Sequence, residues 1–435
     1  MSGLNPNRLS DMERARPLHT RIRNEDMGMN YGKEIARKLE TLAARTMKNG
    51  EIWRAVYTDE DREAKRIIKE WMENAGLSVY EDPMGNLFGR LQGETDKVIL
   101  IGSHIDTVKN GGKYDGAAGI ATAVAALEIL VRNAGRPDKT IEVVALAEEE
   151  GSRYDRSYLG SKGITGKLAR EDLFDVDSEG ITIFDAMSGA GYSPSELEKV
   201  VREDIEAFVE LHVEQGPVLH AEGIKIGVVN SIVGIFSYEI KIRGFQNHAG
   251  TTPMRMRKDP VVALARIINE VTAEAQKISD TATITFGRIE TVPGMSNVIA
   301  QEVIFTVDLR DGVNGKIEEI DEMLKAKLKN AEADGYEVSI KTGCREMPVS
   351  LDKRIVDTIR EAALSRGIEF IEINSGAGHD AQIFADAIPT GMIFIPSVDG
   401  ISHSPLEYTT EEDLEAGMLV LLSTVQKLAY SKACD

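Results

Sequence analysis

The sequence predicts an α/β protein with two domains: a larger one with a mostly parallel sheet and helices on both faces, and a smaller α+β domain inserted into it. Three observations predict this fold class. The chain has 435 residues, which exceeds what one hydrophobic core usually supports. Strand and helix patterns alternate in its first third. The middle then changes to the order strand, helix, strand, strand, helix, strand.

The first third predicts strand–helix–strand units. "KVILIGS" (97–103) and "IEVVALA" (141–147) are short apolar runs bounded by turn residues, as buried strands are. The Ala-rich stretch 116–135 between them is almost entirely apolar, which indicates a buried helix. Residues 59–76 have apolar side chains at helical spacing and end at a glycine, so they predict another helix. Strands joined through a helix usually pair in parallel, hence the expected parallel sheet.

The inserted domain is predicted from its own run of elements. Helix 259–271 has Asp259 as N-cap and Pro260 at its first position. The other expected elements are strands 231–245, 281–290, 301–311 and 336–342 and a charged helix over 315–334. Their order is that of a split βαβ, ferredoxin-like domain.

The larger domain resumes after the insert. Helix 352–365 and strand 391–397 return to the first pattern. We therefore expect a first domain made of residues 1–229 and 349–435, interrupted by residues 230–348.

The composition argues against several classes of function. The formal net charge is −20, which does not suit binding to nucleic acid phosphates or an anionic membrane face. No apolar run approaches the roughly 18 residues of a membrane span, and residues 1–20 lack the apolar segment of a secretory signal. The two cysteines, Cys344 and Cys434, have no metal-type spacing, and such sparse use suits a reducing compartment. A cytoplasmic protein is expected.

Polar clusters lie at or near the ends of predicted strands, where open α/β sheets collect their ligands. The clusters are His104, Asp106 and Asp115 after strand 97–103; Glu148, Glu149 and Glu150 after strand 141–147; His403 after strand 391–397; and His212 with Glu214 in the strand-like "VELHVEQG". Histidine together with carboxylates suits a divalent metal such as zinc or manganese. One histidine alone would be read as a hydrogen-bonded structural residue, but three in such clusters favour a metal site. No local motif such as H-E-x-x-H supports it.

Other chemistries find less support. Ser103 lies in no G-x-S-x-G nucleophile elbow. Neither cysteine lies in a motif that would lower its pKa, and "GGKYDGAAG" lacks the G-K-[ST] of a phosphate loop. Nucleophilic catalysis and nucleotide binding are therefore not expected.

A set of motifs resembles one known family. "GSHIDTV…YDG", "AEEEGSRY", "LHVEQG", "NHAGTTPM", "SNVI…DLR", "GAGHDA" and "GISHSP" occur in that order between about residues 85 and 410. They are similar to motifs of the ureido-hydrolysing branch of the aminoacylase-like di-metal amidohydrolases. That branch includes allantoate amidohydrolases, N-carbamoyl-L-amino acid hydrolases and β-ureidopropionases. Residues 1–30 show no counterpart, and no role is assigned to them.

The resemblance implies two divalent metal ions, zinc or manganese, and the residues around them. The matching metal ligands are His104, Asp115, Glu150, His212 and His403, with Asp115 as the carboxylate that bridges both ions. Glu149 matches the general base, which takes a proton from water and passes it to the leaving nitrogen. Asp106 matches an acid that orients the ring of His104. Without the resemblance, Asp106 would be read as a turn-stabilising residue.

A pair of metal ions would also explain the three adjacent glutamates 148–150. Three adjacent carboxylates at the end of an apolar strand repel one another and resist ionising, unless positive charge is near. Neighbours in a regular strand point to opposite faces. Glu149 and Glu150 can both face the metals only if the strand ends or bends there, with Gly151 helping the chain to turn. Glu148 would then have no role at the metals, and we expect Ala or Asn to be tolerated at position 148 better than at positions 149 and 150.

For the inserted domain the resemblance implies a lid that also forms a homodimer. His248 matches a histidine that reaches the carbonyl oxygen of the substrate, often in the partner subunit's site. The implied substrate-binding positions are Gln215, His248, Asn297, Arg310, Gly378 and His379. Arg310 is expected to hold the substrate carboxylate through a two-pronged ion pair. Without the resemblance, Arg310 would be a surface salt-bridge partner and His248 a loop histidine.

The implied substrate is a small ureido acid whose cleavage releases ammonia and carbon dioxide. Stretches such as "VVALAEEEGSRY" and "NHAGTTPMRMRKD" are similar to allantoate amidohydrolases beyond the shared ligands, so allantoate is favoured. N-carbamoyl-L-amino acid hydrolase and β-ureidopropionase are the alternatives. Dipeptidases and aminoacylases of the wider superfamily usually have a glutamate where His212 stands. A protein without catalytic activity would not need every ligand and the base.

Overall fold

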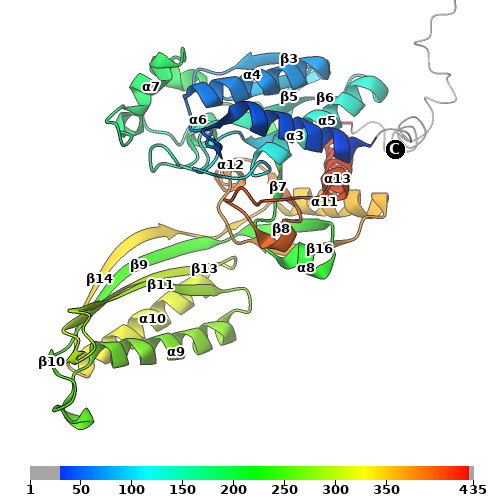
Figure 1. Ribbon diagram of the computed structural model, residues 1–435. Helices are drawn as coiled ribbons and strands as arrows, with labels where there is room; N and C mark the ends of the chain where they lie inside the picture. The colour runs from blue at the N-terminus through cyan, green and yellow to red at the C-terminus, as the bar shows by residue number, and fades with distance from the viewer. Residues whose placement is uncertain (1–29, 431–435) are drawn as a thin grey trace, which may run out of the picture. The chain divides into compact units, whose positions relative to one another are not determined.

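A computed structural model describes residues 30–430 of the protein (Figure 1). Residues 1–29, to which the sequence assigns no role, and Cys434 lie outside the described residues. The chain divides into two compact units. The large unit consists of the described parts of Met1–Asn230, Leu351–Ile373 and His379–Asp435, and the small unit consists of Ser231–Ser350 and Asn374–Gly378.

The central sheet has nine strands in the order β15-β8-β17-β7-β5-β6-β4-β3, with β16 paired to β8. Their bounds are β3 Ser78–Glu81, β4 Leu87–Leu91, β5 Thr95–His104, β6 Lys139–Leu146, β7 Ile205–Val213, β8 Ile226–Ile232, β15 Val349–Ser350, β16 Phe370–Ser375 and β17 Thr390–Ile395. The strands predicted at 97–103, 141–147 and 391–397 are thus β5, β6 and β17.

The prediction of a mostly parallel sheet is wrong, because the sheet is mixed. The four central strands β17, β7, β5 and β6 pair in parallel. The pairs β6–β4, β4–β3, β8–β17 and β15–β8 are antiparallel. The connection between β3 and β4 is the short turn 82–86, in which Asp82 accepts hydrogen bonds from the amides of Met84 and Asn86. A turn this short permits only antiparallel neighbours.

Helices cover both faces of this sheet. The described helices of the large unit are α3 Tyr31–Thr46, α4 Asp59–Asn74, α5 Ala117–Asn133, α6 Leu159–Ile164, α7 Ile183–Gly189, α8 Val218–Glu222, α11 Lys353–Arg366, α12 Asp380–Ala385 and α13 Glu411–Ala429. Helices α5 and α13 approach β7 closely at Leu211, through Gly119 and Gly417. Helix α12 packs on the opposite face, where the rings of Phe384 and Phe208 lie 4.2 Å apart. Leu211 and Phe208 point to opposite faces because side chains alternate along a strand.

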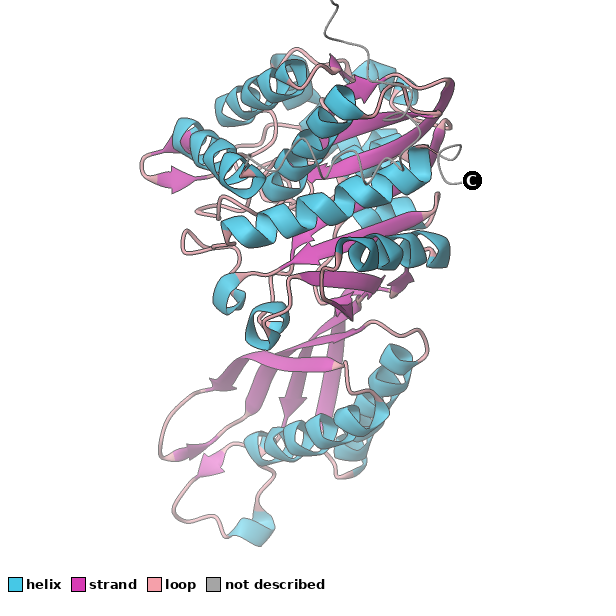
Figure 2. Cartoon of the chain, turned by 90° about the vertical axis from the view of Figure 1, so that its right-hand side faces the viewer, coloured by secondary structure: helices cyan, strands magenta, loops and turns pink. Residues whose placement is uncertain are grey.

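The small unit has a four-stranded antiparallel sheet in the order β11-β13-β9-β14. Its elements are β9 Gly234–Arg243, α9 Pro260–Ile278, β11 Thr283–Val292, β13 Glu302–Asp311, α10 Lys316–Ala333 and β14 Glu337–Glu346. Asp259 caps α9 by accepting from the amide of Val261, and Pro260 opens the helix as expected. Both helices lie on one face of the sheet (Figure 2). Alternate residues of β9, from Phe236 to Ile242, are buried beneath them.

The remaining strands form two short antiparallel pairs. They are β1 Met47–Lys48 with β2 Glu51–Ile52 in the large unit, and β10 Asn247–His248 with β12 Val298–Ile299 in the small unit. Across residues 30–430, no helix combines the length and apolar character that a membrane crossing needs.

Candidate active site

The carboxyl ends of the four parallel strands bring the predicted ligands together. His104 is the last residue of β5, and His212 lies one residue before the end of β7. The glutamate triplet follows β6, and His403 lies in the loop after β17. Parallel strands end at the same edge of a sheet, so residues that are far apart in the sequence converge there.

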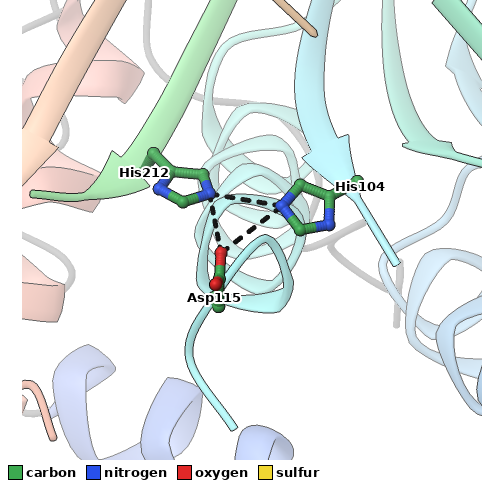
Figure 3. Close-up of side chains that lie close together, drawn as sticks. All are labelled: His104, Asp115 and His212. Carbon is green, nitrogen blue, oxygen red and sulfur yellow. Dashed lines mark hydrogen bonds and ion pairs between the residues drawn. The ribbon is translucent and has the colours of Figure 1, made fainter. Parts of the chain in front are cut away.

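The first group of side chains consists of His104, His212 and Asp115 (Figure 3). The Nε2 atoms of His104 and His212 lie 3.4 and 3.1 Å from Asp115 Oδ1, and 3.3 Å from each other. All three residues are at most 2% exposed. Their outer ring nitrogens contact backbone oxygens: His104 Nδ1 lies 3.1 Å from Asp106 O, and His212 Nδ1 lies 2.8 Å from Val213 O. Protons on both Nδ1 atoms leave the Nε2 lone pairs directed at Asp115, as metal ligands require.

The second group lies on the other side of the same aspartate. His403 Nε2 is 3.2 Å from Asp115 Oδ2 and 3.5 Å from Glu150 Oε2. Gln215 donates from Nε2 to Asp115 Oδ2 at 3.1 Å. The two oxygens of Asp115 therefore face two different sets of histidine and carboxylate, which is the arrangement of a bridging ligand.

Local backbone geometry places Asp115 at this point. Gly116 follows it with a φ of 60°, a conformation that favours glycine. A Cβ at Gly116 would lie 2.5 Å from the carbonyl oxygen of His104, so a side chain there would displace the loop. Helix α5 begins directly afterwards, at Ala117.

The chain bends at the glutamate triplet, as expected from the sequence. Strand β6 ends at Leu146, and both Glu148 (φ 52°) and Gly151 (φ 66°) adopt the left-handed conformation. Asp106 holds the bend: its Oδ1 accepts from the amide of Glu149 at 2.9 Å and its Oδ2 from the amide of Glu150 at 3.0 Å. Asp106 thus contacts both the backbone that carries the glutamates and the ring of His104.

The three glutamates have different surroundings. Glu149 Oε2 lies 4.0 Å from His104 Nε2, and Glu150 contacts His403. Glu148 is fully buried, and its Oε1 accepts from the amide of Arg153. Glu148 is in neither of the groups around Asp115, although it is no less buried than its neighbours.

The ionisation of the site reflects an excess of buried carboxylate. Burial raises the pKa of Glu149 well above its usual value, and burial together with the charge of Asp115 raises the pKa of Glu150 to about 7. Burial would also raise the pKa of Asp115, but hydrogen bonds from the histidines outweigh it and hold that pKa well below the usual range. The hydrogen bond to Asp115 raises the pKa of His403 to about 9. Added positive charge would relieve this crowding of carboxylates.

The donor atoms fit divalent cations. Among the described residues, the groups that could hold a metal ion include His104–Asp115–His212, Asp115–Glu150–His403 and His104–Glu149–Glu150. Glu150 Oε1 and Gln215 Oε1 are buried and have no hydrogen-bond partner within residues 30–430. Mixed imidazole and carboxylate ligands suit zinc or manganese.

The predicted substrate-binding residues fall in both units. Gln215 lies beside Asp115, and the buried ring of His379 packs against His212 with centroids 4.5 Å apart. His248, Asn297, Arg310 and Gly378 belong to the small unit.

Contacts within the small unit orient two of these residues. His248 is exposed, and its Nδ1 accepts from the amides of Gly250 and Thr251, so its proton lies on Nε2. Arg310 donates to Asp308 from Nε and Nη2 and to Gly376 O from Nη1. The ion pair with Asp308 is the salt bridge expected from the sequence alone.

Comparison with known proteins identifies the family. The model of Peptidase family M20/M25/M40 matches residues 100–427. This chain belongs to the M20/M25/M40 family. A protein of Bacillus subtilis (strain 168) named allantoate amidohydrolase is 41% identical over 386 residues, covering 88% of this chain and 94% of that protein. An N-carbamoyl-L-amino-acid amidohydrolase of Pseudomonas sp. (strain NS671) is 37% identical over 388 residues, which cover 87% of this chain and 94% of that protein.

A solved structure has the same fold. The crystal structure of an amidase of the hydantoinase/carbamoylase family from Burkholderia multivorans superposes with a TM-score of 0.86 at 34% identity. The superposition covers 93% of this chain and 98% of the Burkholderia multivorans chain. The resemblance found in the sequence motifs is therefore confirmed.

Sequence reasoning missed several buried charged residues around the M20 site. They are Arg54, Glu210 and Glu407. Glu210 carried a signal, because a glutamate two residues before His212 in an apolar strand points to the same face; it accepts from Ser103 Oγ and from the amide of Ala381. Arg54 donates from Nε to the carbonyl oxygen of Ile105 in the loop that bears His104. Nothing in the surrounding sequence marks Arg54 or Glu407 as buried.

Proposed function

We propose that this protein is a metal-dependent amidohydrolase that cleaves a ureido C–N bond of allantoate, releasing ammonia and carbon dioxide. The observation that carries the proposal is Asp115, whose two carboxylate oxygens face two separate sets of ligands. The relative named allantoate amidohydrolase supports the choice of substrate.

Two divalent cations, zinc or manganese, are assigned to these sets. His104, His212 and Asp115 would hold one, and Asp115, Glu150 and His403 the other. Such cations, when bound, lower the pKa of a bound water and polarise a carbonyl oxygen.

Glu149 is assigned the proton transfers. It is buried, its Oε2 lies 4.0 Å from His104 Nε2 of the first ligand set, and burial raises its pKa well above the usual value. A general base works best when its pKa is near the working pH. Glu149 would accept a proton as water attacks the ureido carbon, and would deliver it to the nitrogen that leaves as ammonia. The remaining carbamate then loses carbon dioxide.

The small unit is assigned substrate recognition, as a lid and as the surface through which two chains form a homodimer. Because Nδ1 of His248 accepts two backbone hydrogen bonds, its Nε2–H is available to donate to the oxygen that becomes negative during attack. This donation could serve the site of the same chain or that of a partner. Arg310 would exchange Asp308 for the carboxylate of the substrate, with Asn297 and Gly378 as further contacts. In the large unit, Gln215 and His379 are assigned to the same substrate.

The alternative is an N-carbamoyl-L-amino acid hydrolase, which the relative from Pseudomonas favours. Ammonia release from allantoate, several N-carbamoyl-L-amino acids, N-carbamoyl-β-alanine and a dipeptide, measured side by side with added Mn²⁺ or Zn²⁺, separates the possibilities. We expect the highest kcat/KM for allantoate. A higher value for an N-carbamoyl amino acid would overturn the choice of substrate, and cleavage of the dipeptide alone would overturn the ureido assignment.

Metal affinity should rise steeply with pH. In the metal-free protein the pKa of His403 is about 9 and that of Glu150 is about 7, so a cation must displace protons at neutral pH. Between pH 7 and 9 the cation displaces one proton, from His403, so we expect the metal affinity to rise about tenfold per pH unit. Below pH 7 it also displaces a proton from Glu150, so the affinity should rise more steeply with pH. Chelator-competition titrations at several pH values measure this slope. An affinity independent of pH would contradict the assignment of His403 and Glu150 as ligands.

The same raised pKa values predict how the metal-free protein responds to pH. Protonated His403 and Glu150 stabilise the folded state, and this contribution is complete below their unfolded pKa values of about 6.5 and 4.3. It is lost as pH rises through about 7 for Glu150 and about 9 for His403. The Tm of the metal-free protein should therefore fall between pH 5 and 9 more than that of the metal-loaded protein.

Replacing Arg310 with lysine should raise KM more than it lowers kcat. A two-pronged pair with the substrate carboxylate becomes a single contact, and the loss of one charged hydrogen bond predicts a KM increase of about 10- to 100-fold. Arg288→Lys is the matched control, because Arg288 lies on a strand of the same sheet and pairs with Glu239 at the exposed surface. An equal loss of activity towards a ureido compound without a carboxylate would contradict the role given to Arg310.

A further inference from the structure

We infer that Glu407 is a positioning residue that fixes the bridging aspartate and the loop of His403 relative to each other. The inference rests on the proposed metal centre. It concerns a residue outside both ligand sets, which touches neither the proposed metals nor the substrate.

The carboxylate of Glu407 joins two segments that are far apart in the sequence. Its Oε2 accepts from the amides of Tyr114 at 2.9 Å and Asp115 at 3.0 Å. Its Oε1 accepts from Ser402 Oγ at 3.1 Å. Ser402 precedes His403, and Glu407 closes the same loop by donating its own amide to Ser404 O. One side chain therefore binds the backbone on which Asp115 stands and the loop on which His403 stands.

These hydrogen bonds are shielded from water. Glu407 is 3% exposed and Asp115 is 2% exposed. The amides of Tyr114 and Asp115 lie in the loop just before the N-cap of α5, Gly116, and are not part of the hydrogen-bond ladder of the helix. Without Glu407, both amides would be buried without this partner, and the loop would have to move to satisfy them.

The loop that carries Asp115 is built closely around this carboxylate. A Cβ added at Gly112 would lie 2.1 Å from Glu407 Oε2 and 2.7 Å from Glu407 Cβ. No side chain fits at Gly112 unless Glu407 moves. Gly112→Ala therefore disturbs the contact without changing Glu407 or any proposed ligand.

Movement of the Asp115 segment would affect both proposed metals, and movement of the His403 loop would affect the second. Asp115 supplies an oxygen to each ligand set, and His403 completes the second. His403 is held in the left-handed conformation with a φ of 54°, which a relaxed loop would not preserve. Loss of such supporting hydrogen bonds typically weakens metal binding by about 10- to 100-fold.

The test measures Mn²⁺ affinity of the full chain by competition with a fluorescent chelator. Glu407→Ala and Gly112→Ala should each weaken binding at both sites by about 10- to 100-fold while far-ultraviolet circular dichroism stays that of the wild type. Glu407→Gln should restore most of the affinity, because the amide oxygen can accept from both backbone amides and the amide nitrogen can donate to Ser402. Glu412→Ala, on the exposed first turn of α13, is the control for loss of a nearby negative charge.

The outcomes separate this inference from the proposed function. If the wild type binds no Mn²⁺, the metal centre itself is wrong. If the wild type binds two ions and Glu407→Ala binds them equally well, the role of Glu407 is wrong. Equal losses in Glu407→Gln and Glu407→Ala would show that charge and not hydrogen bonding matters, which also overturns positioning. Should Glu407→Ala fail to fold, unchanged affinity in a folded Gly112→Ala would overturn it.

Discussion

Replacing Glu149 with glutamine should remove nearly all turnover and leave both metal ions bound. Glutamine has the same size but cannot accept and return a proton, and general acid–base catalysis contributes about 10²- to 10⁴-fold to rate. Glu149 is within neither set of ligands around Asp115, so metal content should stay at the wild-type level. Measuring kcat for allantoate together with metal content by mass spectrometry checks both parts of the expectation.

Glu148→Gln is the matched control for this substitution. Glu148 is the preceding residue and equally buried, but its carboxylate accepts from the amide of Arg153. We expect Glu148→Gln to keep near-normal kcat. Near-normal turnover in Glu149→Gln, or equal losses in both variants, would show that the base is assigned to the wrong residue.

Asp115→Asn should bind neither metal ion at metal concentrations that saturate the wild type. Each oxygen of Asp115 faces one ligand set, and asparagine offers one oxygen and no negative charge. Two like cations held close together also need the bridging carboxylate to offset their mutual repulsion. Metal content after equilibrium dialysis, and turnover at saturating substrate, measure the effect.

His403→Ala provides the comparison for Asp115→Asn. His403 belongs to one ligand set, while His104, His212 and Asp115 form the other without it. We expect His403→Ala to keep one ion of the two. If Asp115→Asn also keeps one ion, Asp115 does not bridge.

Much of the candidate site could be anticipated from the sequence because most of its residues lie at or near strand ends. An apolar run followed directly by histidine or glutamate is visible in one dimension, and parallel strands then bring such ends to one edge. The bend at Glu148 and Gly151 followed from the same reasoning, since Glu149 and Glu150 could not otherwise lie on one side.

What escaped prediction depends on contacts between distant segments. The antiparallel strands β3 and β4 at one side and β8 and β15 at the other make the sheet mixed. The turn 82–86 between β3 and β4 separates two runs with little periodicity. Glu407 and Arg54 look like surface residues in the sequence, because long charged side chains are rarely buried. Their burial follows from partners such as the amide of Asp115 and the carbonyl of Ile105, whose positions only the folded chain defines.

The most direct test of the two-metal account is a titration of metal-stripped protein with Mn²⁺ while ammonia release from allantoate is recorded. The account predicts no turnover in the stripped protein and activity that reaches its maximum at two equivalents of metal per chain. Asp115→Asn should stay inactive throughout the same titration. Full ammonia release from the stripped protein, or from Asp115→Asn, would contradict the account.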